Sequence, residues 1–109
     1  MVIICNNDMG AYVKYRVAFR NNNKTAWGLN VNGLYAVYSY GEHFPIYAYD
    51  PAVSMWFKNT DKYSVTTSKH QRQCDPGVDD GISEVDTEEL KRVIRLGGWA
   101  NYCADRMAA

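Results

Sequence analysis

The chain has 109 residues, of which 47% are hydrophobic, and its twelve basic and twelve acidic side chains leave no net charge. This length predicts a single domain over residues 1–109, and the hydrophobic content excludes wholesale disorder. The even balance of charge excludes a protein that coats nucleic acid through charge alone.

Cysteine usage and the first residues indicate the compartment. The chain has three cysteines and no CxxC spacing, so neither a zinc site nor a thioredoxin-like motif is indicated. The thiols are therefore expected to be reduced. The first ten residues lack the basic start and long apolar core of a signal peptide. No apolar run approaches the length of a membrane-spanning helix. We therefore expect a soluble cytoplasmic protein that makes no contact with a membrane.

The first third of the chain predicts strands. Residues 11–20 alternate between two sets of side chains, which is the period of a half-buried strand. An Asn cluster at 21–24 predicts a turn, and a second short strand follows over 26–31. Asn32–Gly33 is a strong signal for a hairpin.

The middle of the chain continues this pattern. Strands are predicted over 34–41, 44–50 and 53–57, and Pro45 favours a strand start or a sheet edge. Joined to the strand over 26–31, they predict a small antiparallel sheet, a meander of about four to five strands.

Two helices are predicted after this sheet. A hydroxyl at 66–68 is expected to cap a short helix that follows the Thr-Thr-Ser-Lys-His-Gln motif and runs to about Cys74. The polar, acidic segment 74–86 is expected to be the least rigid part of the chain. A helix is then predicted near 87–96. The fold class is therefore α+β.

The signals for the second helix are the more specific. Asp86 as N-cap and Glu89 three residues later form a capping box. Gly97–Gly98 ends the helix. Aromatic residues just beyond are expected to dock the tail, which leaves 106–109 frayed.

The segment 62–71, KYSVTTSKHQ, concentrates hydroxyl, amide, imidazole and ammonium groups. Hydroxyls and backbone amides at a helix start, beside Lys69, His70 and Arg72, would form a cradle for an anion. The alternative is that one hydroxyl caps the helix and the other side chains form a solvated face.

Catalysis and metal binding are only weakly indicated by the sequence. Ser68 with His70, or Cys74 with a histidine, lacks any recognisable nucleophile motif, and His43 and His70 lack the spacing of metal ligands. We therefore expect no catalysis, no metal and no cofactor. The acidic run 75–89 lacks calcium-loop spacing, but its carboxylates could imitate phosphates toward another protein.

The strands are rich in aromatic residues, and basic residues follow over 58–73. Together they would suit a nucleic-acid-binding module, in which bases stack on an aromatic sheet. The aromatic candidates are Tyr35, Tyr38, Tyr40, Tyr47, Tyr49 and Trp56.

Two phrases, VYSYGEHFPIYAYD at 37–50 and DKYSVTTSKHQRQ at 61–73, with Trp56 between them, resemble a family of small uncharacterised proteins of bacteriophages and mobile elements. The family motifs are YSYG and YSxTTSKHQ, and the resemblance covers residues 34–73. It implies a setting in the host cytoplasm and no particular reaction. The candidate binding residues are Tyr38, Tyr40, His43, Tyr63, Thr66, Thr67, Ser68, Lys69, His70, Gln71 and Arg72.

We therefore predict a non-enzymatic phage accessory protein that binds a host or defence protein during infection. Its contact surface is predicted to comprise Thr66 to Gln71 and the turn that holds His43. The alternative is the nucleic-acid-binding module that uses the aromatic sheet and the basic segment 58–73. No pattern in the sequence predicts an oligomeric state.

Overall fold

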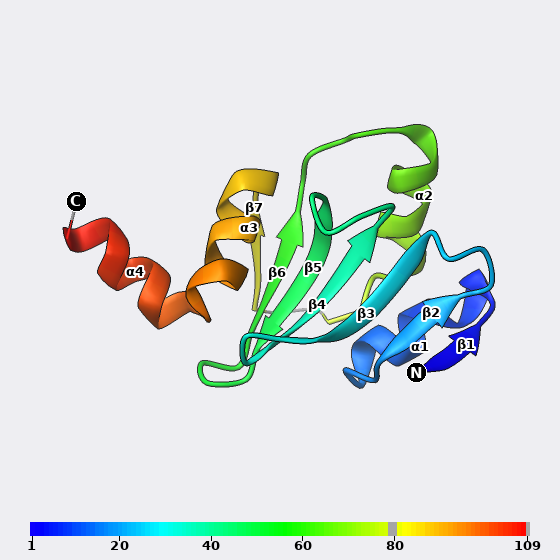
Figure 1. The fold of residues 1–109 in the computed structure, drawn as a ribbon, viewed down its shortest axis with the longest axis horizontal. Helices are drawn as coiled ribbons and strands as arrows, with labels where there is room; N and C mark the ends of the chain where they lie inside the picture. Colours follow the sequence, from blue (N-terminus) through cyan, green and yellow to red (C-terminus); the bar gives the residue numbers. More distant parts are fainter. Residues whose placement is uncertain (79–80, 109) are drawn as a thin grey trace.

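The computed structural model describes residues 1–78 and 81–108, which form an α+β fold, as the sequence predicts (Figure 1). Seven strands make one sheet whose spatial order is the chain order. The strands are β1 (Val2–Ile4), β2 (Phe19–Asn21), β3 (Ala26–Val31), β4 (Leu34–Ser39), β5 (Pro45–Asp50), β6 (Met55–Asn59) and β7 (Ile82–Val85). The helices are the short 3-10 helix η1 (Asn6–Asp8), α1 (Met9–Lys14), α2 (Val65–Gln73), α3 (Thr87–Leu96) and α4 (Trp99–Ala108).

The predicted meander is present over β3 to β6, but the sheet that contains it is larger and mixed. β2 to β6 pair antiparallel, whereas β1 pairs parallel with β2, and β6 pairs parallel with β7. The β3–β4 hairpin turns at Asn32 and Gly33, whose φ angles of 51° and 85° are both positive, as a type I′ turn requires. The predicted hairpin is confirmed.

The prediction of a strand over 11–20 is wrong, because the first part of this range belongs to α1. Met9 and Val13 lie one helical turn apart and are both fully buried. The helix is followed by Arg16, whose φ of 56° reverses the chain, and β2 begins only at Phe19. The burial of one face of this helix therefore decided the local structure, although the side chains alternate as in a strand.

The segment 74–86 was expected to be the least rigid, and this is wrong for its C-terminal part, because Ile82–Val85 form β7. Residues 79–80 lie outside the described residues. β7 pairs with β6 so that Glu84 stands opposite Lys58. The pairing joins distant segments, so the polar local composition did not reveal it.

The two parallel pairs explain why α1 and α2 lie on one face of the sheet. Each helix belongs to a crossover connection between two parallel strands, and both crossovers step across the sheet in the same direction. Crossovers of this kind are right-handed. Met9 and Val13 of α1 and Cys74 at the end of α2 accordingly lie in one buried cluster with Phe19 and Val37.

The opposite face is only partly covered. Leu90 and Val93 of α3 pack in a second buried cluster with Phe57 of β6 and Val85 of β7. Within residues 1–78 and 81–108, no helix lies in front of β3 and β4 on this face (Figure 1). Apolar side chains there, such as Leu29, therefore remain partly exposed.

The predicted N-cap of α3 and the glycine at its end are confirmed, but the full capping box is not: among the described residues the Glu89 carboxylate accepts from the Tyr102 hydroxyl at 3.3 Å and not from the Asp86 backbone N–H. The Asp86 carboxylate accepts a hydrogen bond from the Glu89 backbone N–H at 2.8 Å, as an N-cap should. Gly97 follows the last turn in the left-handed region, with a φ of 85°. Sequence signals were reliable here because both are local.

The chain end differs from the expectation of fraying over 106–109. α4 extends to Ala108, and Ala109 lies outside the described residues. The helix starts against the sheet, where Asp50 accepts a hydrogen bond from the Trp99 backbone N–H at 2.8 Å. Beyond its first turns α4 projects away from the sheet (Figure 1).

Candidate functional site

Helix α2 contains the Thr-Thr-Ser-Lys-His-Gln motif instead of following it. The N-cap is Ser64, whose side chain accepts a hydrogen bond from the Thr67 backbone N–H at 3.1 Å. The prediction of a cap at 66–68 is therefore wrong by at least two residues. Because the cap lies earlier, the motif residues fall on two sides of one helix.

The inner side of α2 is polar, although it is buried. Thr67, His70, Gln71 and Cys74 follow the spacing i, i+3, i+4, i+7 of a helical face that packs inward. His70 is 2% exposed, and its Nδ1 lies 2.7 Å from the Ser39 hydroxyl oxygen in β4. The same hydroxyl lies 3.2 Å from that of Thr67. Burial, and then the charge of the adjacent Lys69, lower the pKa of His70.

Gln71 joins α2 to the segment that follows β6. Its amide nitrogen donates to the backbone oxygens of Asn59 at 3.1 Å and Asp61 at 2.9 Å. Its amide oxygen accepts from Lys62 Nζ at 3.3 Å. Its backbone oxygen accepts from the Tyr47 hydroxyl at 2.8 Å. Gln71 is thus a structural residue, and with Thr67 and His70 it cannot contact a partner directly.

The outer side of α2 faces solvent. Thr66, Lys69 and Arg72 are exposed and Ser68 is half-buried. A shallow hollow of about 350 Å³ lies beside them. Its lining residues are Lys62, Tyr63, Ser64, Val65, Ser68 and Arg72. Among the described residues, ion pairs form only within α3 and between α3 and α4, so the cations around α2 have no carboxylate partner.

An aromatic edge borders this hollow. Tyr63 is 64% exposed, and its ring centroid lies 5.5 Å from that of Phe44 and 6.2 Å from that of His43. Tyr40 is 47% exposed and lies over His70, with ring centroids 5.6 Å apart. The resulting α2 surface comprises Tyr40, His43, Lys62, Tyr63, Val65, Thr66, Ser68, Lys69 and Arg72.

Nucleophilic catalysis finds no support at this site. The Ser39–His70 pair has the separation of a nucleophile and its base, but both side chains are buried. Cys74 is also buried, which raises the pKa of its thiol to about 12. In residues 1–78 and 81–108, no three His, Cys, Asp or Glu side chains are grouped to hold a metal ion.

Most of the aromatic side chains that were predicted to form a stacking platform for nucleic-acid bases are buried. Tyr35, Tyr47 and Trp56 are buried in the cluster on the α1 and α2 face of the sheet, and Tyr38 is buried on the other face beside the second hollow described below. Only Tyr40, which stands beyond the end of β4, is substantially exposed among the aromatic candidates. The aromatic part of the nucleic-acid alternative is therefore mostly inaccessible, whereas Lys62, Lys69 and Arg72 of its basic segment are exposed.

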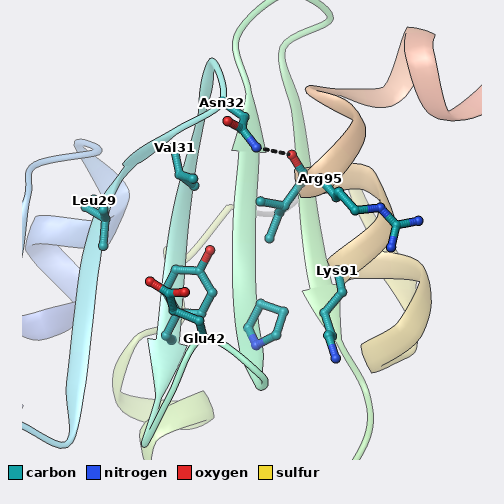
Figure 2. Close-up of a pocket in the computed structure, with 9 residues that line it drawn as sticks. Leu29, Val31, Asn32, Glu42, Lys91 and Arg95 are labelled. Carbon is teal, nitrogen blue, oxygen red and sulfur yellow. Dashed lines mark hydrogen bonds between the residues drawn. The ribbon is translucent and has the colours of Figure 1, made fainter.

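A second hollow, the α3 groove, lies on the other face of the sheet, between α3 and strands β3 and β4 (Figure 2). It has a volume of about 290 Å³. Its lining residues are Leu29, Val31, Asn32, Tyr38, Glu42, Pro45, Lys91, Ile94 and Arg95. Sequence reasoning chose only Tyr38 from this set. The signal it could have used is Lys91 and Arg95, which are four residues apart beside the apolar stripe of α3.

Fold and surface define a small α+β protein with a mixed sheet, a hollow beside α2 and a groove beside α3. No family model matches the chain, and neither curated proteins nor solved structures match it. No helix among the described residues has the length and apolar character needed to cross a membrane.

Proposed function

We propose that this protein is a non-enzymatic accessory factor whose α2 surface binds a host or defence protein. Following its resemblance to phage proteins, we place this binding in the cytoplasm of an infected cell. The observation that carries the proposal is that the two sides of α2 have different roles. Thr67, His70 and Gln71 hold the helix rigidly, while Lys69 and Arg72 project unpaired beside a hollow.

The composition of the α2 surface favours a protein partner. Val65 is 87% exposed, and with Tyr63 it places apolar area between Lys62 and Arg72. Tyrosine and arginine are enriched at the centres of protein interfaces, where apolar contact and charged hydrogen bonds occur together. A partner surface with carboxylates around an apolar patch is complementary to this arrangement.

The test is capture from nuclease-treated bacterial lysates with the tagged protein, compared with the double variant Lys69→Glu, Arg72→Glu. We expect one protein to be enriched by the wild type and its recovery to fall at least about ten-fold in the variant, because both cations become repulsive. The matched control is Lys14→Glu, Lys24→Glu, which reverses two exposed charges outside the α2 surface.

Two outcomes contradict the proposal. If nuclease treatment abolishes capture, the bound species is nucleic acid. If both double variants recover the same protein as the wild type does, the α2 surface is not the contact. Circular dichroism of each variant checks that the fold is intact.

A further inference from the structure

We propose that the α3 groove is a second docking site, which binds a short segment of a partner protein carrying an apolar side chain next to an acidic one. The site lies on the opposite face of the sheet from α2, and it does not depend on the function proposed for the α2 surface. Three features support it: an apolar floor, a row of cations and an unused hydrogen-bond donor.

The floor is apolar because α3 covers only part of its face of the sheet. Leu29 and Val31 from β3 are partly exposed there, and Ile94 from α3 closes the other side. The volume of about 290 Å³ is at the lower end of the range for ligand pockets, about 300–1,000 Å³. It suits a few side chains of a peptide better than a bulky cofactor.

The cations stand along one rim. Lys91 and Arg95 are four residues apart on α3, which corresponds to a rise of about 6 Å along the groove. Arg95 is exposed and has no carboxylate within ion-pair distance in the described part of the chain. Lys91 lies 3.8 Å from the highly exposed Glu88, a pair that contributes little. Both cations are therefore available to an acidic ligand.

The unused donor is the Tyr38 hydroxyl. Tyr38 is 6% exposed, lines the groove and makes no side-chain hydrogen bond to any described residue. Burial, and then the charge of Glu42, raise the pKa of Tyr38, so the hydroxyl stays protonated and can donate. Among the described residues, the buried side-chain oxygen and nitrogen atoms without a hydrogen-bond partner do not include this hydroxyl, so it is open to the groove, where a ligand carboxylate or carbonyl can accept its hydrogen bond.

Charge also sets the direction of the bound segment. Figure 2 shows Glu42 and Lys91 across the groove from each other, and Arg95 nearer to Asn32. Glu42 offsets Lys91 at one end, so the positive potential is strongest at the Arg95 end. An acidic residue of the segment belongs there. A row of cations beside an apolar floor fits a polypeptide, which offers an apolar side chain and a carboxylate at successive positions.

The test begins with a random peptide library selected for binding to the wild-type protein. We expect enrichment of sequences in which a large apolar residue lies next to Asp or Glu. One enriched peptide is then titrated by fluorescence anisotropy against Arg95→Glu and Tyr38→Phe. Affinity should fall at least about ten-fold with Arg95→Glu, and about ten-fold with Tyr38→Phe, which removes one donor to a charged group.

Arg72→Glu is the matched control, since it makes the same charge change on the α2 surface and should leave the affinity unchanged. Peptides without acidic enrichment, or with equal affinity for Arg95→Glu, overturn the proposal. Loss of affinity with Arg72→Glu alone assigns the peptides to the α2 surface and also overturns it. Competition by octanoate as effective as an unlabelled copy of the peptide would show that a simple apolar carboxylate suffices, contrary to a polypeptide ligand.

Discussion

His70 lies beneath Tyr40 with its Nδ1 2.7 Å from the Ser39 hydroxyl oxygen. Its buried ring is kept neutral by the same burial that lowers its pKa. A histidine of this kind contributes to stability only while it is uncharged. Its neighbour Lys69 is exposed, so adjacent residues of one motif have different roles.

We predict that the free energy of unfolding falls as the pH drops below about 6.5, the ordinary pKa of histidine. The pKa of His70 is lower in the folded protein than in the unfolded chain, so the unfolded chain takes up the proton first. The stability is therefore complete above the unfolded-state pKa and is lost as the pH falls toward the folded-state value. Urea unfolding from about pH 8 to about pH 5 measures this slope.

The other histidine of the chain provides the control. His43 is exposed, and His43→Gln should keep the pH dependence of the wild type. His70→Gln should flatten it between these pH values, whatever its effect on stability at neutral pH. An unchanged slope in His70→Gln would assign the pH dependence to other groups.

At the scale of single residues, the sequence located the polar cluster but not the role of each member. The roles depend on which face of α2 packs against the sheet, where Ser39 lies beside His70 and the Tyr47 hydroxyl donates to Gln71. Thr67, His70 and Gln71 lie on that face. Reading hydrophobic periodicity could not find this face, because its residues are polar and are satisfied by hydrogen bonds to distant strands.

At the scale of elements, α4 depends on a residue far from it in sequence. Asp50, at the end of β5, accepts hydrogen bonds from the backbone N–H groups of Trp99 at 2.8 Å and Ala52 at 3.0 Å. In the sequence, Asp50 is only the last residue of the strand predicted over 44–50. The carboxylate approaches so closely because Gly98 has no Cβ, which would lie 2.8 Å from Asp50 Oδ2.

We predict that Gly98→Ala destabilises the protein by at least about 2 kcal/mol, because it combines backbone strain at a φ of 135° with this collision. Gly77→Ala is the matched control. Gly77 has a φ of 69°, but nothing lies near its missing Cβ, so about 1 kcal/mol of strain is expected. Urea unfolding measures the free energy of unfolding of both variants. Equal losses of this free energy would show that Asp50 does not restrict position 98.

Elements with local signals were predicted well. The β3–β4 hairpin and α3 have their turn and cap residues within a few positions of one another. β1, β7 and α1 were missed, because parallel pairing and the burial of a short helix depend on segments that are distant in sequence. The α3 groove was missed for a related reason, since it exists only where α3 stops short of β3.

At the scale of the molecule, the protection of backbone amides from hydrogen exchange should decrease from the middle of the sheet toward its edges. All six residues of β4 are buried, whereas only Ile4 of β1 is buried. β1 also pairs with a single neighbour, which leaves its outer backbone groups without a strand partner.

We predict that amide hydrogens of β4 exchange only through global unfolding, while those of β1 exchange orders of magnitude faster through local opening. Native-state hydrogen exchange followed by NMR measures both. Equal protection of β1 and β4 would mean that the edge opens only when the whole sheet does.

The β4–β5 turn has a further consequence, because it borders both hollows. Glu42 lines the α3 groove, and the next residue, His43, contacts Tyr63 at the edge of the α2 surface. One partner chain long enough to wrap around this hairpin tip would occupy the two sites together. Its second contact would then form at a high effective concentration, so two individually weak sites would hold it with the avidity of a much larger interface.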